Sequence, residues 1–176
     1  YALTTITEDA TWGDEDEPVL VLGASDALLL KRDAEGSPSW ARRLGGLNVD
    51  IAAAMAVDSE DQLVVAGSFQ SGMKFAGELL PHTGGADVFL VTYDTAGELR
   101  WGLGLGGFGD DSVASVATGV SGEIALVGAA VSPASFGGEV LTSDRDPTLG
   151  VVALYEGGGA ALWSRAVIST APVSLV

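Results

Sequence analysis

The sequence predicts an all-β protein made of β-propeller blades, each a sheet of four antiparallel strands. Three observations support this fold class. The chain repeats itself with a period near 61 residues, it alternates short strand-like runs with glycine turns, and no window keeps a 3.6-residue apolar period with capping signals. Four strands per unit, many turns and no helix are typical of propeller blades. A β-sandwich of about ten strands, or a β-solenoid, is the alternative.

The repeat is clearest at the tryptophans, because Trp40, Trp101 and Trp163 are spaced 61 and 62 residues apart. A shift of 61 aligns residues 25–85 with residues 86–146, and 17 of these 61 pairs are identical. The identities are spread over the whole unit without a gap. The chain therefore divides into the end of a preceding repeat (1–24), repeat 1 (25–85), repeat 2 (86–148) and a partial repeat 3 (149–176), all within one propeller-like domain.

Each unit is predicted to form two β-hairpins. In repeat 2, residues 87–93 are a β-branched and aromatic run, a turn follows at 95–97, and a second strand ends at Gly106-Gly107. Residues 113–118 and 123–131 then form two strands around a turn at 120–122. Repeat 1 has the matching turns at 34–36 and 59–61, and three glycines at 157–159 occupy the first turn of repeat 3.

The number of units is smaller than a propeller needs. The 176 residues hold about three units, whereas propellers close with roughly 4–8 blades. An open arc would expose strand edges, which pair and aggregate unless they are covered. We therefore expect the remaining blades to come from another chain, a second copy or further sequence, so that a homo-oligomer is one possible assembly.

Composition excludes several classes of function. The 24 acids outnumber the 8 bases and give a net charge of −16, which disfavours nucleic-acid binding. There is no cysteine, so a disulfide scaffold, a thiolate zinc site and a cysteine nucleophile are excluded. The longest apolar run, residues 124–131, is far shorter than the ~20 residues of a bilayer span, so no membrane span is expected.

No catalytic residues and no cofactor site are predicted, and we expect the protein not to be an enzyme. His82 is the single histidine, and its counterpart in repeat 2 is Ser143. Residues 102–107 match G-x-G-x-x-G, but a further strand follows them where a dinucleotide site needs a helix. A structural role in packing between blades is expected for the three repeated tryptophans.

Acidic loops supply the candidate metal ligands. Six carboxylates fall within residues 8–17, and Gly109-Asp110-Asp111 recurs in part at Asp50. Converging carboxylates and carbonyls bind Ca²⁺, which gives the candidate ligands Asp14, Asp16, Asp50, Asp110 and Asp111. The competing and favoured interpretation is that the 8–17 loop is solvated and that the other aspartates cap their own turns.

Several segments resemble the repeats of bacterial SBBP-type (seven-bladed β-propeller) proteins: residues 87–97, 54–58, 65–69 and 136–138, and Trp101 with Gly106-Gly107 and 109–111. This resemblance covers nearly the whole chain and rests on structural motifs. It implies a β-propeller in an exported or cell-surface bacterial protein, without shared catalytic residues. Repeat 3 departs from the pattern, because Glu156 stands where Asp33 and Asp94 stand in the other copies.

The predicted function is that of a non-enzymatic propeller module, which acts as a scaffold or protein-interaction domain in a bacterial surface or exported protein. A carbohydrate- or calcium-binding propeller is the alternative. Function is expected in the loops at one end of the ring, where the copies differ, namely residues 8–17, 46–50, 69–74 and 107–112.

Overall fold

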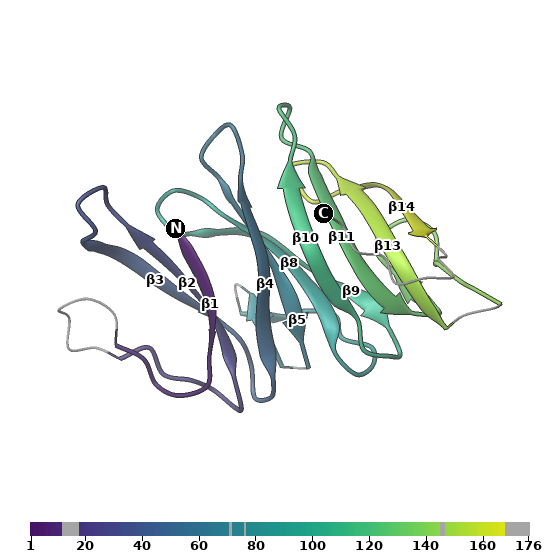
Figure 1. Ribbon diagram of the computed structural model, residues 1–176, viewed down its shortest axis with the longest axis horizontal. Coiled ribbons are helices and arrows are strands. Elements are labelled where there is room, and N and C mark those ends of the chain that lie inside the picture. The colour runs from purple at the N-terminus through teal and green to yellow at the C-terminus, as the bar shows by residue number, and fades with distance from the viewer. Residues whose placement is uncertain (12–17, 71, 76, 145–146, 168–176) are drawn as a thin grey trace.

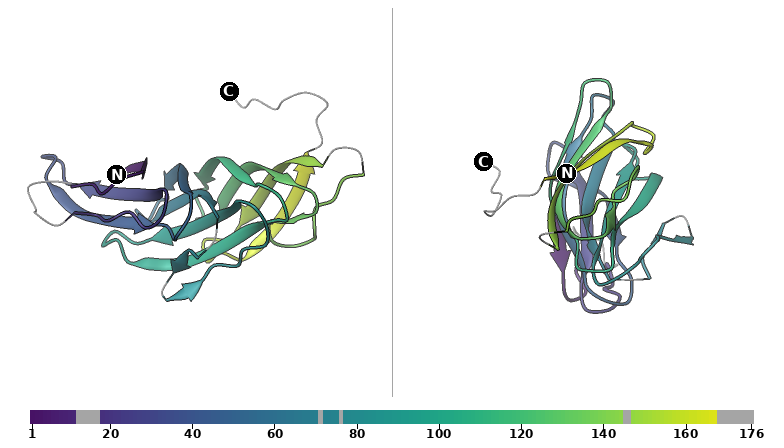
Figure 2. Two further views of the ribbon diagram at one scale, coloured as in Figure 1. Left: turned by 90° about the horizontal axis from the view of Figure 1, so that it is seen from below. Right: turned by 90° about the vertical axis from the view of Figure 1, so that its right-hand side faces the viewer.

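The computed structural model describes residues 1–11, 18–70, 72–75, 77–144 and 147–167, and these residues form strands and turns without a helix. Twelve of their fourteen strands make three antiparallel sheets that follow one another along the chain, and the other two form a small separate hairpin (Figure 1). The expected all-β class is therefore confirmed. The left view of Figure 2 shows the same succession of sheets from below. Among the described residues, no helix has the length and apolar character that a bilayer crossing requires.

Each sheet is built from strands that are neighbours in sequence. The first sheet contains β1 (Ala2–Ile6), β2 (Asp26–Arg32) and β3 (Pro38–Leu44). The second contains β4 (Asp50–Val57), β5 (Leu63–Phe69), β8 (Asp87–Tyr93) and β9 (Leu99–Gly107), with the short β12 (Ala134–Ser135) added beside β9. The third contains β10 (Ser112–Thr118), β11 (Ile124–Val131), β13 (Thr148–Tyr155) and β14 (Ala161–Val167). A small hairpin, β6 (Lys74–Phe75) and β7 (Glu78–Leu79), lies between β5 and β8 in sequence.

The two hairpins predicted for repeat 2 are present, but they lie in different sheets. β8 pairs with β9 in the second sheet, and β10 pairs with β11 in the third. The sequence repeat therefore runs from the middle of one sheet to the middle of the next. The second and third sheets have four consecutive antiparallel strands, and the first has the counterparts of three of them, because β1 matches β5 when the chain is shifted by 61 residues.

Two hydrophobic cores hold the three sheets together. One lies between the first and second sheets and includes Leu29, Phe89 and Val91, and the other lies between the second and third and includes Leu90 and Leu126. β8 contributes to both, because successive side chains of a strand point to opposite faces. All seven residues of β8 are buried, which explains why residues 87–93 are an almost continuous apolar run.

Two of the three repeated tryptophans, Trp40 and Trp101, join consecutive sheets, as expected. The indole of Trp40, on β3, lies over the β8–β9 turn of the second sheet, where an added Cβ at Gly97 would come within 2.8 Å of the ring. Trp101, on β9, repeats the contact with the β13–β14 turn of the third sheet. Its Nε1 donates to the carbonyl of Gly157 at 2.8 Å, and a Cβ at Gly159 would lie 3.0 Å from its ring.

Tyr155 closes the second core, and its hydroxyl donates to the carbonyl of Phe136 at 2.8 Å, with both side chains fully buried. Tyr155→Phe leaves that carbonyl without its buried donor, so we expect a loss of about 1–2 kcal/mol in the free energy of unfolding. Urea unfolding measures this loss. Tyr1→Phe is the matched control, because Tyr1 is 39% exposed, and it should change little. Equal effects of the two variants would contradict the assignment.

Candidate functional site at the long-loop end

The two ends of the strands differ in their connections. At one end, which we call the tight-turn end, the connections are short and similar (residues 33–37, 58–62, 94–98, 119–123 and 156–160). At the opposite, long-loop end lie residues 7–25, 45–49, 70–86, 108–111 and 132–147. The loops in which function was expected all belong to the long-loop end, although residues 12–17 lie outside the described residues.

Aspartates at the tight-turn end cap their own turns, as the favoured interpretation predicts. The Oδ1 atom of Asp94 accepts the amides of Ala96 and Glu98 at 3.0 and 2.9 Å. Asp58 accepts the amides of Glu60 and Gln62 in the same way, at 2.8 Å each. These carboxylates stabilise turns by satisfying backbone donors.

Buried aspartates fix two loops of the long-loop end in the same manner. Residues 45–50 and 106–111 share the pattern Gly-Gly, an apolar residue, two further residues and Asp. The amide of Gly46 donates to Oδ2 of Asp50 at 2.6 Å, and the amide of Gly107 donates to Oδ2 of Asp111 at 2.7 Å. Both aspartates are at most 2% exposed. The side chain at the end of each loop thus determines the conformation of its beginning.

Each of these aspartates also meets a second buried aspartate from the preceding sheet. Asp87 begins β8, Asp111 precedes β10, and their carboxyl groups interact directly. An added Cβ at Gly106 would lie 2.2 Å from Oδ2 of Asp111 and 2.5 Å from Oδ1 of Asp87, so the two carboxyls occupy the space beside this glycine. The pKa of Asp111 is raised to about 6, mainly by burial and also by the neighbouring Asp87, against two backbone donors that lower it.

The same arrangement occurs between the first and second sheets. Burial and the charge of Asp26 raise the pKa of Asp50. An added Cβ at Gly45 would meet Oδ1 of Asp26, which corresponds to the contact of Asp87 at Gly106. Here Arg43 donates to the other oxygen of Asp26 at 3.1 Å. The buried oxygens Oδ1 of Asp26 and Asp87 accept no hydrogen bond, which is the pattern expected of carboxyl groups that face each other.

Large apolar side chains project from these fixed loops. Leu47 and Phe108 occupy equivalent positions directly after the glycine pairs, and each is 74% exposed. Leu79 and Val140 form a second equivalent pair, each 60% exposed. Isolated exposed apolar residues are ordinary on protein surfaces. Their recurrence at the same places in consecutive repeats distinguishes this end of the molecule.

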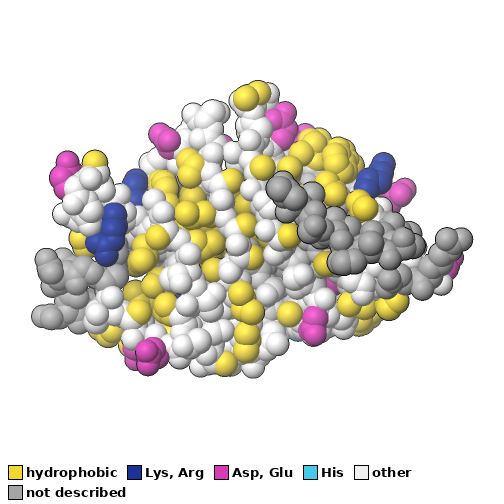
Figure 3. Space-filling model, in the orientation of Figure 1, with side chains coloured by type: hydrophobic (Ala, Val, Ile, Leu, Met, Phe, Trp, Pro, Cys, Tyr) yellow, Lys and Arg dark blue, Asp and Glu magenta, His cyan; other side chains and the backbone are white. Residues whose placement is uncertain are grey.

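The surroundings of these apolar side chains are acidic. The described part of the long-loop end has six exposed carboxylates: Glu8, Asp9, Glu78, Asp110, Glu139 and Asp144. Among the same described residues, Lys74 is the single lysine or arginine. Figure 3 shows Asp and Glu side chains at both ends of the strands on one face, at the upper margin beside the tight turns and at the lower margin beside the long loops, with hydrophobic side chains between them. This distribution gives the long-loop end a negative potential, which attracts cationic partners.

The five candidate calcium ligands do not come together in the described part of the chain. Asp14 and Asp16 lie outside it. Asp50 and Asp111 are buried and accept backbone amides, and Oδ1 of Asp110 accepts the amide of Ala86 at 2.9 Å. No group of three or more His, Cys, Asp or Glu side chains is placed to hold a metal ion among the residues described.

The structure also shows where the G-x-G-x-x-G match and the single histidine lie. Residues 102–107, which match G-x-G-x-x-G, lie within β9, and β10 follows them. The His82 ring is partly buried rather than solvated. Its Nε2 lies 2.8 Å from the carbonyl of Gly85, and the ring packs edge-on against Phe69 at 5.6 Å between centroids.

No protein-family model matches the chain. The chain is similar to the "Regulatory protein FlaEY" of Caulobacter vibrioides, with 31% identity over 123 residues, or 66% of this chain. The matched segment spans 13% of that relative.

Sequence reasoning missed half of each buried aspartate pair. Asp26 and Asp87 are identical positions in the repeat, but they looked like ordinary first residues of strands. The sequence signal for these pairs is that Asp26, Gly45, Gly46 and Asp50 are each identical in the next repeat. These residues lie together only because two consecutive sheets pack against each other, which the sequence alone does not show.

Proposed function

We propose that this chain is a section of a β-propeller that acts as a non-enzymatic scaffold and binds a protein partner at its long-loop end. The propeller is supported by the succession of antiparallel sheets with the same strand order, and by the contacts of Trp40 and Trp101 with the following sheet. A β-sandwich would have two facing sheets, whereas three are described here. Further blades would complete the ring.

The observation that carries the binding role is the recurrence of Leu47 and Phe108. Their loops are held by buried carboxylates, so these side chains are exposed from a defined backbone and not from a loosely held segment. Fixed apolar side chains at the centre of an interface contribute most to affinity, and a charged rim selects the partner. We infer a partner segment that is both apolar and basic.

The location of this module is proposed from the resemblance to SBBP-type repeats, which occur in exported or cell-surface bacterial proteins. Since the matched relative is a regulatory protein and is covered over a small part of its length, its role adds no specific partner here. A scaffold that presents loops at one end of a rigid array suits a surface or exported assembly.

The double variant Leu47→Ser/Phe108→Ser tests the binding role. The chain is used as bait, with cross-linking, in cells that produce the protein, and bound proteins are quantified by mass spectrometry. We expect at least a roughly tenfold loss of the captured partner, because exposed anchors are removed while the fold keeps its cores. The melting temperature should remain close to that of the parent.

Val120→Ser is the matched control, because Val120 is 94% exposed and lies at the tight-turn end. This variant should retain the partner. Equal capture by the parent and the double variant, or equal loss in the control, would contradict binding at the long-loop end.

A further inference from the structure

The contact between the first and second sheets uses two residues of β3. The Nε1 atom of Trp40 donates to the carbonyl of Thr95 at 3.2 Å, and Nε of Arg42 donates to the carbonyl of Gly97 at 2.7 Å. Both acceptors belong to the β8–β9 turn. A Trp-x-Arg sequence on the last strand of one sheet therefore holds a turn of the next sheet.

The third sheet carries the same pair on its last strand. Trp163 and Arg165 of β14 correspond to Trp40 and Arg42. Arg165 has the same local hydrogen bond as Arg42, from NH1 to the carbonyl of the residue before it, at 2.8 and 2.9 Å respectively. Arg165 thus has the local hydrogen bond that Arg42 has where it holds a turn.

These side chains point away from the core. Ala166 packs against the core between the second and third sheets, and the alternation along β14 places Trp163 and Arg165 on the opposite face. Trp163 is 39% exposed, and Arg165 is exposed. The neighbouring outward positions on β13, Val152 and Leu154, are apolar and partly exposed. No further sheet covers this face within the described residues.

The first sheet has the complementary half of the contact. Its β2–β3 turn has the same geometry as the β8–β9 turn: the amide of Gly36 donates to the carbonyl of Asp33 at 3.2 Å, and that of Gly97 to Asp94 at 3.0 Å. Gly36 and Gly97 have φ values of 86° and 77°. An added Cβ at Gly36, however, would meet nothing within 4 Å, so no indole occupies this turn.

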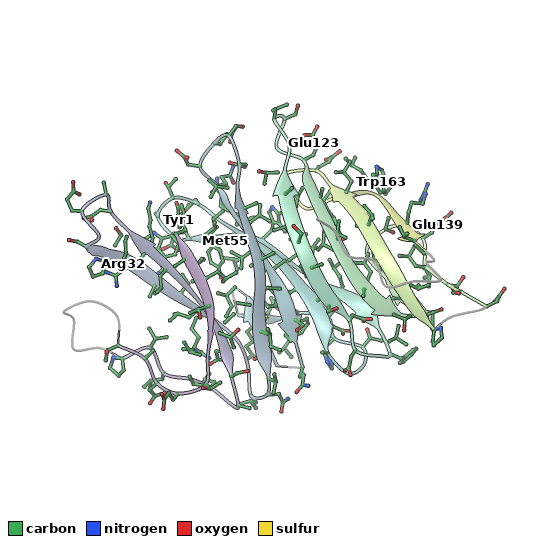
Figure 4. All side chains as sticks on the ribbon, in the orientation of Figure 1. Tyr1, Arg32, Met55, Glu123, Glu139 and Trp163 are labelled. Carbon is green, nitrogen blue, oxygen red and sulfur yellow. The ribbon has the colours of Figure 1, made fainter. Side chains whose placement is uncertain are left out.

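The two incomplete halves lie at opposite ends of the stack of sheets. Figure 4 shows Arg32, next to the β2–β3 turn, at one end and Trp163 at the other. We propose that Trp163 and Arg165 of one copy of this chain dock on residues 33–37 of a second copy, in a head-to-tail interface. This inference rests on the proposed propeller and assigns its joining residues. Such heterologous interfaces close into rings or extend as filaments.

Charge and hydrogen bonding at the turn suit this partner. Asp33 and Glu35 are exposed acids beside the position that Arg165 would reach. The carbonyl of Gly36 already accepts NH1 of Arg32 at 2.7 Å, and a carbonyl oxygen has a second lone pair for another donor.

Ser37 offers a gain-of-function test. Its equivalent in the second sheet is Glu98, whose Oε1 atom lies 3.4 Å from NH2 of Arg42. Ser37→Glu should create the same ion pair with Arg165 of the docked copy. We expect about two- to fivefold tighter self-association, as is typical of exposed ion pairs. The gain should disappear in the double variant Ser37→Glu/Arg165→Ala, which shows whether the two residues meet.

Sedimentation equilibrium of the purified chain over a range of concentrations measures the association. The parent should associate reversibly, and Trp163→Ala should weaken the association roughly 30-fold, as loss of a central aromatic anchor does. Leu162→Ala is the matched control, since Leu162 is the neighbouring residue of the same strand, is 47% exposed and has no part in the proposed contact, and it should associate like the parent.

A parent chain that stays monomeric at its highest soluble concentration would overturn the proposal. So would association that Trp163→Ala leaves unchanged, or that Leu162→Ala weakens equally. Binding of a partner through Leu47 and Phe108 does not depend on this interface, so capture by a monomeric Trp163→Ala variant would separate failure of the docking proposal from failure of the proposed binding function.

Discussion

Gly106→Ala is expected to destabilise the protein by about 3–5 kcal/mol, enough to unfold a small domain of ordinary stability. Two costs add at this position. Gly106 has a φ of 145°, which an L-residue adopts with a strain of about 1–3 kcal/mol. The new Cβ would also lie 2.2 Å from a carboxylate oxygen of Asp111 and 2.5 Å from one of Asp87, and overpacking of this kind costs about 1–3 kcal/mol.

A second glycine separates the two costs. Gly122 has a φ of 85°, and an added Cβ there would meet nothing within 4 Å. Gly122→Ala should therefore show the backbone strain alone, about 1–2 kcal/mol. Urea unfolding of both variants measures the difference. If Gly106→Ala is no more destabilising than Gly122→Ala, then the two carboxyl groups do not fill the space beside Gly106.

The free energy of unfolding is expected to fall by about 2–3 kcal/mol between pH 4 and pH 6. The pKa of Asp111 is about 6 in the folded protein, against 3.8 for an ordinary aspartate, mainly because burial disfavours its charged form. Below pH 4 the carboxyl is protonated in both the folded and the unfolded chain. Between pH 4 and pH 6 only the folded chain keeps the proton, so stability is lost as the pH rises through the folded pKa. Asp50, whose pKa is also raised, acts in the same direction.

Asp87→Asn assigns this pH dependence to the aspartate pair. Oδ2 of Asp87 accepts the amide of Thr83 at 2.6 Å, a bond that the asparagine carbonyl keeps. The new amide group would face Asp111 and donate to it, which replaces a repulsion between two carboxylates by a hydrogen bond. We expect the variant to be about 1–3 kcal/mol more stable than the parent at pH 7.5, with a smaller loss between pH 4 and pH 6.

The control removes one negative charge elsewhere. Asp144 is an exposed residue of the long-loop end. The free energy of unfolding of Asp144→Asn should therefore depend on pH as that of the parent does. Chemical unfolding at half-unit steps of pH gives the profiles. A parent whose stability does not fall over this range, or an Asp87→Asn variant that is less stable at pH 7.5, would contradict the pairing of the two carboxyl groups.

The sequence predicted the strands well, because the signals that define them are local. The expected run at 87–93 is β8, and the turns at 95–97 and 120–122 separate the expected strand pairs. The 61-residue period also marked the tryptophans that join sheets. Local patterns do not show which sheet a strand joins, and the two hairpins of repeat 2 therefore belong to different sheets.

The candidate site was predicted in outline only. The loops at 46–50 and 107–112 were identified because their copies differ, and Asp50 and Asp111 were recognised as turn-capping aspartates. The partner carboxyls, Asp26 and Asp87, come from the preceding sheet, and such a contact depends on how sheets pack. The exposure of Phe108 is equally invisible in sequence, since an aromatic residue beside a strand is more often buried.

Native mass spectrometry paired with denaturing mass spectrometry shows whether these sheets are blades of a ring that needs further blades. Denaturing conditions should give the mass of the single chain, 17.8 kDa. A ring closed by copies of this chain would give a native mass at a whole-number multiple of this value, and two copies of three sheets would make a ring of six. A native mass equal to the single chain at all concentrations would mean that three sheets suffice, and would contradict a propeller closed by assembly.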